Sequence, residues 1–251
     1  MEEQLFESAA EAIKRSKFTV AFTGAGISVE SGIPPFRGKD GLWSKYDMKT
    51  LELDFFFKYP LESWSVIKEI FYDYYGKAKP NKAHLVLAEM EEKGLLKSVI
   101  TQNIDNLHYE AGNKTVYEFH GNMKKLICTG CKKHFTVEDI DFDNLPPRCD
   151  DCGGLIKPDF IFFGEGIPQE AYTGSFHDAS HCEAMLVVGT TGEILPASQL
   201  PYLAKQNGAT IIEVNMAPSK YSGSLTDIFL RGKATEVMGR LGEMLFPAGT
   251  D

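Results

Sequence analysis

Polar side chains able to bind a cofactor or move a proton gather in one stretch, residues 100–121, ITQNIDNLHYEAGNKTVYEFHG. Directly after a short apolar run it carries Gln102, Asn103, Asp105, His108 and His120. A core segment would not hold so many short polar groups, and α/β folds place ligands at the carboxyl ends of parallel strands. Histidine also suits proton transfer, because its ordinary pKa of about 6.5 lies near neutral pH. We therefore predict that this stretch is the chemical centre.

Four of the five cysteines form two close pairs, Cys128-x2-Cys131 and Cys149-x2-Cys152. This spacing is typical of two knuckles that close a tetrahedral zinc site of the ribbon kind. Four thiolates leave no open coordination position, so we expect one structural zinc. In a reducing compartment such close pairs indicate metal binding rather than disulfides. The fifth, Cys182, is interpreted as a small buried apolar residue.

Glycine-rich turns follow two predicted strands. In TGAGIS, residues 23–28, Gly24 and Gly26 would let backbone N–H groups approach a diphosphate. The third glycine of the ordinary dinucleotide fingerprint would fall at Val29, so a plain tight turn also fits the residues at this point. The second turn, GTTG at 189–192, adds hydroxyls suited to phosphate, and Asn215 ends a further strand from which its amide could reach a ribose.

Apolar periodicity predicts the elements that position these groups. Helices are expected at 2–16, 82–93 and 234–245, and buried strands at 18–22, 95–100, 160–163, 185–188 and 210–214. A connecting helix and strand should lie between Asp105 and His120. The alternation predicts an α/β fold with a doubly wound parallel sheet, Rossmann-like. An aromatic insertion follows at 41–75, where most rings should form a small helical core, while Tyr72 and Tyr75 share one helical face and could line a substrate pocket.

Composition excludes several classes of protein. The chain has 251 residues and a net charge of -9, which argues against binding to nucleic-acid phosphates and favours basic protein tails as partners. No apolar run approaches the roughly 20 residues of a membrane span, so no membrane partner is expected. The first residues, MEEQLFESAAEAIKRS, do not look like a signal peptide, which predicts the cytoplasm.

In their order, the motifs resemble the sirtuin family of NAD-dependent protein lysine deacylases. They are GAGIS (24–28), SGIPPFRG (31–38), TQNID (101–105), HG (120–121), the four cysteines, FFGE (162–165), GTT (189–191) and VN (214–215). The resemblance implies a large NAD-binding domain built from 1–39, 80–122 and 159–251. It also implies a small domain that combines a helical insertion, 40–79, with a zinc ribbon, 123–158.

The resemblance further implies roles for individual residues in NAD-dependent deacylation, in which the acyl group passes to ADP-ribose as nicotinamide leaves. His120 is expected to be the general base, and Asn103 to serve in catalysis and in the carboxamide pocket. Cofactor contacts are expected from Gly24, Ala25, Gly26, Ser28, Phe36, Arg37, Gln102, Asn103, Ile104, Asp105, Gly189, Thr190, Thr191, Asn215 and Lys233. Substrate contacts are expected from Tyr72, Tyr75, Ile161, Phe163 and Gly164. The remaining histidines, His84, His108, His134, His177 and His181, are expected to be scaffold. The partners would be acyl-lysine proteins or peptides, and the chain would act as a monomer.

Three departures from the family pattern bear on activity. Pro35 stands where the family usually has an acidic residue, and Thr191 where a serine is common. Sirtuins specialised for acidic acyl groups carry Tyr-x-x-Arg in the helical insertion, whereas the aligned pair here is Tyr72 and Tyr75. Without the arginine a succinyl carboxylate lacks a bidentate partner. We therefore expect removal of acetyl and longer neutral acyl groups.

Three alternatives stay open at this stage. A protein mono-ADP-ribosyltransferase on the same fold would cleave NAD in the same way but modify a different acceptor. An NAD-dependent dehydrogenase would want a glycine at position 29 and an acidic ribose partner after a second strand, whereas the region near Asp47 is aromatic and loop-like. A non-catalytic zinc-ribbon protein that binds nucleic acid is disfavoured by the acidic charge.

Overall fold

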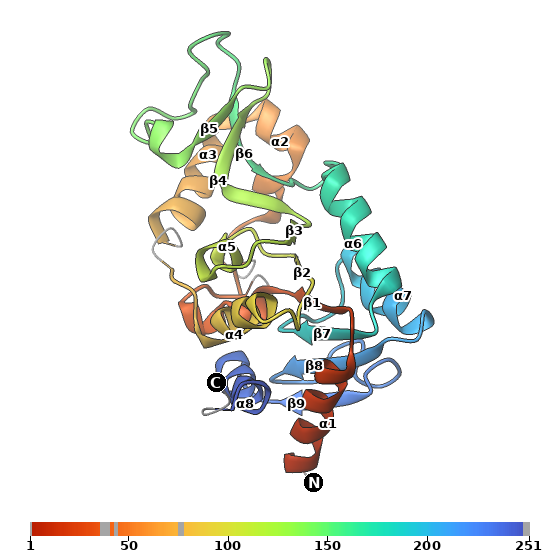
Figure 1. Cartoon of the computed structure of the whole chain (residues 1–251). Coiled ribbons are helices and arrows are strands. Elements are labelled where there is room, and N and C mark those ends of the chain that lie inside the picture. Colours follow the sequence, from red (N-terminus) through yellow and green to blue (C-terminus); the bar gives the residue numbers. More distant parts are fainter. Residues whose placement is uncertain (1, 36–40, 43–44, 75–77, 248–251) are drawn as a thin grey trace.

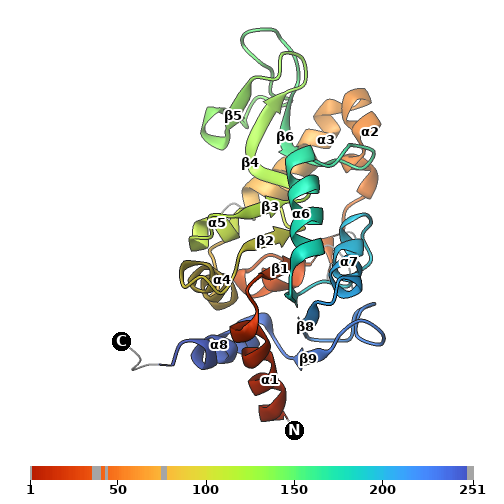
Figure 2. The ribbon, with the colours of Figure 1, turned by 45° about the vertical axis from the view of Figure 1, so that its right-hand side comes forward.

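The computed structural model describes residues 2–35, 41–42, 45–74 and 78–247. Two sheets divide these residues into a large and a small layer, and the helices at 2–15 and 234–245 lie at the end of the molecule farthest from the small sheet (Figures 1 and 2). Within the described part of the chain, no helix combines the length and apolar character needed to cross a bilayer.

The large sheet is six-stranded and wholly parallel, in the order β3-β2-β1-β7-β8-β9. Its strands are β1 (Thr19–Thr23), β2 (Ser98–Thr101), β3 (Val116–Glu118), β7 (Ala184–Val188), β8 (Thr210–Asn215) and β9 (Ile228–Arg231). Both central strands, β1 and β7, are buried along their whole length, as expected for a parallel sheet covered on both faces. The strand order reverses between them, and this switch point is where doubly wound folds bind ligands.

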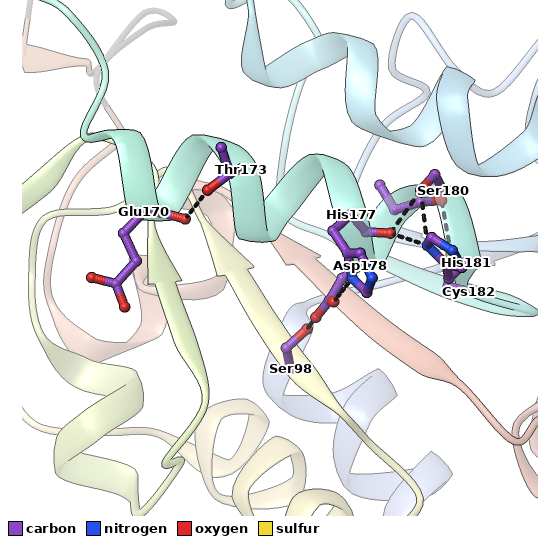
Figure 3. Close-up of polar contacts among 9 residues, drawn as sticks. Ser98, Glu170, Thr173, His177, Asp178, Ser180, His181 and Cys182 are labelled. Carbon is purple, nitrogen blue, oxygen red and sulfur yellow. Dashed lines mark hydrogen bonds and ion pairs between the residues drawn. The ribbon is translucent and has the colours of Figure 1, made fainter.

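Helices cover both faces of this sheet (Figure 1). The helices are α1 (Glu2–Arg15), α4 (Lys82–Glu92), α5 (Leu107–Ala111), α6 (Gln169–His181), α7 (Leu200–Gln206) and α8 (Ala234–Leu245). One core joins α1, α4 and α8 to the sheet, and a second joins α6 and α7 to it. Helix α6 is also tied to β2, because the Ser98 hydroxyl donates a 2.6 Å hydrogen bond to the buried carboxylate of Asp178 (Figure 3).

The small layer has its own aromatic core. It combines an antiparallel sheet of order β5-β4-β6 with a helical segment. Its elements are β4 (Gly121–Cys128), β5 (His134–Thr136), β6 (Ile156–Phe160), a 3-10 turn η4 (Met48–Leu51), α2 (Leu53–Lys58), α3 (Pro60–Ile67) and a π-helical segment η5 (Lys68–Tyr74). Trp64, Phe56 and Phe162 are fully buried at the interface between the helices and the sheet. The indole N–H of Trp64 donates to the Ile156 carbonyl at 2.9 Å, which fixes the helices to the ribbon.

Most sequence predictions of elements are confirmed, and one is wrong. The predicted helices at 2–16, 82–93 and 234–245 correspond to α1, α4 and α8, and the connecting helix and strand are α5 and β3. The predicted strand at 160–163 is wrong: the strand is β6, it ends at Phe160, and it is antiparallel to β4 in the small sheet. Residues 161–165 instead form a turn that contains one isolated bridge, between Glu52 and Phe163. The apolar run correctly predicts burial, because Phe162 packs in the core of the small layer. It does not predict strand conformation, because buried turns are apolar as well.

Candidate functional site

A cavity of about 710 Å³ opens at the carboxyl ends of the central strands and extends to the small layer. It brings together most of the residues expected to act: Gly24, Ala25, Gly26, Gln102, Asn103, Ile104, His120, Ile161, Phe163, Gly164, Gly189, Thr190, Thr191, Asn215 and Lys233. These residues come from segments far apart in the chain, so the fold alone makes them neighbours. Phe36, Arg37 and Tyr75 lie outside the described residues.

The two glycine turns meet at the base of the cavity. The amide of Gly26 donates to the Gly189 carbonyl at 2.8 Å, and the amide of Gly24 to the Val188 carbonyl at 3.0 Å. A Cβ atom placed on Gly26 would lie 2.6 Å from the Gly189 Cα, closer than any side chain allows. Glycine is therefore required here for two backbones to touch. The bare backbone that results is the kind of surface a diphosphate can approach.

A smaller cavity of about 20 Å³ extends the cleft behind Asn103. Asn103 is 5% exposed, and its amide donates to the Gly24 carbonyl and to the Ser28 hydroxyl, both at 3.2 Å. The Ser28 hydroxyl in turn donates to Asp105 Oδ2 at 2.7 Å, while Asp105 Oδ1 accepts from the Leu107 amide at 3.0 Å. Ser28 and Asp105 line this inner pocket and not the main cleft. Burial raises the pKa of Asp105 above its usual value, opposed by those hydrogen bonds.

The buried side chain of His84 adds a further hydrogen bond to the network of Asn103, Ser28 and Asp105. The backbone amide of Asn81 donates to His84 Nδ1 at 3.3 Å, which assigns the ring proton to Nε2. His84 Nε2 then lies 3.4 Å from the Ser28 hydroxyl, so it donates to that oxygen. Burial lowers the pKa of His84 to about 4, which keeps this ring neutral at pH 7. His108 is also buried, with Nε2 2.9 Å from the Thr23 hydroxyl, and neither ring lines the main cleft.

His120 lies at the meeting point of the two layers. Its Nδ1 lies 3.0 Å from the Gln102 carbonyl, an acceptor, so Nδ1 carries the proton and Nε2 keeps a free lone pair. Burial lowers the pKa of His120 below 6.5, although the bond to Gln102 opposes that shift. The ring is therefore neutral at pH 7, and Nε2 can accept a proton from a group in the cleft.

The second glycine turn, residues 189–192, forms the part of the cleft that would hold an adenosine. The side-chain amide of Gln102 donates to the Thr190 hydroxyl at 3.0 Å, and that of Asn215 donates to the Thr190 carbonyl at 2.9 Å. Lys233 lies on the same wall, with its Nζ 3.6 Å from Glu236 in an exposed pair. The cleft thus offers polar groups along its length, a small inner pocket that contains Asn103 and Asp105, and a base of bare glycine backbone. These features fit a dinucleotide.

The wall toward the small layer is apolar. Besides Ile161 and Phe163 it includes Leu51 and Phe71, which sequence reasoning did not select. Tyr72 is not among the residues that line the cleft; its phenol donates to the Met123 carbonyl at 3.0 Å, and its ring packs on Trp64 and Phe142 in the small core. Its role as a substrate contact stays a prediction. Helical spacing selected the pair of tyrosines but could not tell which face of the segment meets the cleft.

The four paired cysteines converge at the far end of the ribbon. Their sulfurs all lie within 4.8 Å of one another, and Cys128 and Cys149 are buried. Backbone amides point at the sulfurs, from Cys131 to Cys128 Sγ at 3.5 Å and from Gly154 to Cys152 Sγ at 3.4 Å. Such N–H donors stabilise thiolates, so this donor set fits one zinc ion. Zinc would supply a fold-stabilising cross-link and no chemistry in the cleft.

The remaining histidines, His134, His177 and His181, do not line the cleft. His177 and His181 lie on α6 with their rings stacked at 4.3 Å, and His177 Nδ1 bonds to Asp178 at 3.0 Å (Figure 3). Their contacts are local to the helix. The scaffold interpretation agrees with this placement.

Comparisons with known proteins point to one family. The model of the Sir2 family matches residues 24–196. An NAD-dependent protein deacylase of Pyrococcus furiosus is 44% identical over 242 residues, which cover 92% of this chain and 94% of the relative. NAD-dependent protein deacylase 2 of Archaeoglobus fulgidus is 43% identical over 249 residues, which cover 97% of this chain and 96% of the relative.

Solved structures agree. A Sir2 homologue in complex with ADP-ribose superposes with a TM-score of 0.90 at 39% identity, covering 95% of this chain and 96% of the other. A Sir2 protein bound to an acetylated peptide superposes with a TM-score of 0.88 at 36% identity, covering 95% and 97%.

Proposed function

The chain belongs to the Sir2 family, and from that premise we propose that it is an NAD-dependent protein lysine deacylase. The observation that carries the proposal is the single cavity onto which both glycine turns, the Asn103 pocket, His120 and the 161–164 segment open. NAD and an acyl-lysine would share this cavity. In the reaction NAD would supply a ribose carbon with nicotinamide as its leaving group, that ribose would take the acyl group, and one water would be consumed as the free lysine amine is released.

The chain's own residues bind, orient and accept a proton. Asn103, Ile104 and Asp105 hold the carboxamide end, supported by the small cavity they line with Ala25. Gly26, Gly189 and Thr190 hold the diphosphate and adenosine half, supported by the bare backbone of the two turns. Phe36 and Arg37 complete the cofactor contacts by their place in the motif.

His120 Nε2 accepts a proton from a ribose hydroxyl. Its support is the bond from Nδ1 to Gln102, which leaves Nε2 free, and the lowered pKa, which keeps it unprotonated at neutral pH. The apolar wall beside it would pack against the acyl group. General-base help of this kind accelerates reactions by about 10²–10⁴-fold.

The acyl preference follows from the wall that the acyl group meets. Leu51, Phe71 and Phe162 are apolar, and no Arg is among the described residues that line the cleft. Acetyl and longer aliphatic groups are the preferred substrates, because a succinyl carboxylate would be desolvated without a cationic partner. The net charge of -9 suits basic substrate tails and not nucleic acid.

Two further assignments belong to the proposal. The enzyme acts in the cytoplasm, supported by cysteines that are free and grouped for a metal. It acts as a monomer, supported by a cleft to which one chain supplies all the groups named above. Sedimentation of the zinc-loaded protein tests the second point.

The decisive experiment supplies NAD with acetyl-, succinyl- and myristoyl-lysine versions of one peptide and follows nicotinamide and the acylated product by mass spectrometry. Free lysine peptide with O-acyl-ADP-ribose is expected, with kcat/KM for acetyl exceeding that for succinyl by at least about tenfold. ADP-ribosylated protein without deacylation would instead support a mono-ADP-ribosyltransferase. A faster succinyl reaction would overturn the acyl preference alone.

A further inference from the structure

Lys157 is a buried charge that the proposed reaction does not use. It lies on β6 and is 4% exposed, although lysine normally keeps its ammonium in water. Its Nζ donates to the carbonyls of Pro158 at 2.8 Å and Phe160 at 2.7 Å, and it pairs with Glu165 Oε2 at 3.0 Å. These three acceptors satisfy all three N–H groups of the ammonium.

The partner of Lys157 closes a turn. Glu165 Oε2 also accepts from the Phe162 amide at 3.0 Å, and the Glu165 amide donates to the Phe162 carbonyl at 3.0 Å. The ammonium itself lies 4.4 Å from the centroid of the Phe162 ring. Residues 158–165 therefore wrap around one buried cation.

The outer surface of the same turn is the apolar wall of the cleft, where residues 160–165 all line the cavity. The Ile161 amide donates to the His120 carbonyl at 2.8 Å, and Phe163 exchanges backbone bonds with Leu51 and Leu53 at 2.9 and 3.1 Å. The turn therefore joins the strand that leaves the zinc ribbon to the general base and to the helical segment. Lys157 is the group at its centre.

Stability alone does not account for a charge in this place. A buried ion pair pays a desolvation cost that a well-packed apolar residue of similar size would avoid. The ammonium restricts the backbone conformation of the turn, because its three N–H groups must each meet an acceptor. An apolar side chain at this position would allow several backbone conformations. A strict requirement for one backbone path is expected where main-chain groups meet a ligand.

We propose that Lys157 is a positioning residue for the acyl-lysine substrate: through Glu165 and the carbonyls of Pro158 and Phe160 it holds residues 161–165 in the shape that receives the peptide. The inference rests on the proposed function, since it takes this turn as the substrate wall. It assigns Lys157 no contact with NAD. The ion pair acts on the peptide side of the cleft and leaves the cofactor side unchanged.

The test uses the zinc-loaded full chain and the variants Lys157→Met, Glu165→Gln and the double variant, with Lys133→Met as matched control. Methionine keeps the length and packing of the lysine stem and removes its charge. Lys133 forms an exposed pair with Asp151 on the same ribbon, 2.8 Å apart, so its loss should change nothing in the cleft. Affinity for an acetyl-lysine peptide is measured by fluorescence anisotropy, and KM for peptide and for NAD are measured separately.

Lys157→Met is expected to weaken peptide affinity and raise peptide KM about tenfold or more, since small displacements of positioning groups are costly. KM for NAD and zinc content should stay within about twofold of wild type. Because both residues act through one pair, the double variant should be no worse than Lys157→Met alone. Lys157→Arg, which keeps the charge, should recover part of the peptide affinity.

Unchanged peptide affinity in Lys157→Met would overturn the inference, as would equal losses for peptide and NAD. If Lys157→Met fails to fold, Glu165→Gln carries the same expectation, and an unchanged peptide KM in that variant has the same consequence. A wild-type protein that binds the peptide but never deacylates it would overturn the proposed function and leave the affinity comparison valid. A wild-type protein that binds no acyl-lysine peptide would overturn both.

Discussion

At the scale of the residue, the chemistry depends on which nitrogen of an imidazole carries the proton. In His120 the Nδ1–H donates to the Gln102 carbonyl, and burial keeps Nε2 unprotonated at neutral pH. In His84 the Nδ1 atom accepts from the backbone amide of Asn81, so the ring proton is on Nε2, which donates to Ser28. The same side chain is thus available as a base in one position and is a hydrogen-bond donor in the other.

Replacement of His120 with alanine should lower the rate of NAD-dependent deacylation about 10²-fold or more, because it removes the proposed general base. Zinc content and the thermal midpoint should match those of His134→Ala, a control on the exposed ribbon surface. The wild-type pH profile of kcat/KM should lose activity on the acid side with a midpoint below pH 6.5, since burial lowers the pKa of His120. Full activity in His120→Ala would remove this residue from the mechanism.

A second residue-scale prediction concerns stability and pH. Burial lowers the pKa of His84 to about 4, whereas in the unfolded chain it should titrate near 6.5. Between these values the unfolded state binds more protons, so the free energy of unfolding must fall as pH drops from 6.5 toward 4, by about 3 kcal/mol from this group. His108, buried beside it with a lowered pKa, adds a change of the same sign.

Urea unfolding at pH 7, 6 and 5 measures this dependence. In His84→Gln the loss of stability between pH 7 and pH 5 should be smaller than in wild type, even though the variant is less stable at pH 7. His177→Gln, on the exposed face of α6, should keep the wild-type dependence. Identical slopes in wild type and His84→Gln would show that this ring does not titrate as its burial requires.

At the scale of the element, the cleft depends on two turns that touch. Gly26→Ala should destabilise the protein by roughly 1–3 kcal/mol and weaken NAD binding, because its Cβ would lie 2.6 Å from Gly189 and must push the turns apart. Gly223→Ala is the matched control, since no atom lies within 4 Å of its added Cβ. Denaturant midpoints and calorimetric titration with NAD measure both effects. Equal behaviour of the two variants would contradict the close contact.

At the scale of the whole molecule, loss of the zinc ribbon's structure is expected to abolish activity in the cleft. Chelation of the metal should remove the cross-link among the four cysteines and loosen β4 and β6. Strand β4 begins directly after His120, and β6 leads into the turn at 161–165, so both sides of the cleft should be disturbed. Activity should fall to background while far-UV circular dichroism retains the signal of the large sheet and its helices. Restored zinc should restore activity. A metal-free protein with full activity would show that the ribbon is dispensable.

The sequence by itself determined the zinc ligands, the family, and the segments that surround the cleft. Short motifs such as Cys-x2-Cys and the glycine turns are local in sequence, so they can be recognised without knowledge of the tertiary structure. Helices with strong apolar periodicity were also predictable from the sequence, and α8 has the predicted bounds, 234–245. Periodicity reports which face of an element is buried, and that was sufficient for these elements.

Only the tertiary structure decided which side chains meet. The apolar run at 160–163 predicts a strand, whereas the strand ends at Phe160 and a turn follows, because buried aromatic residues occur both in strands and in turns that pack on a core. Helical spacing selects Tyr72, and only the structure shows that its phenol donates to the Met123 carbonyl while Phe71 lines the cleft. The Lys157–Glu165 pair joins a ribbon strand to a turn through contacts that no spacing rule encodes. Such contacts depend on side-chain direction and on backbone path, and packing between the two layers fixes both.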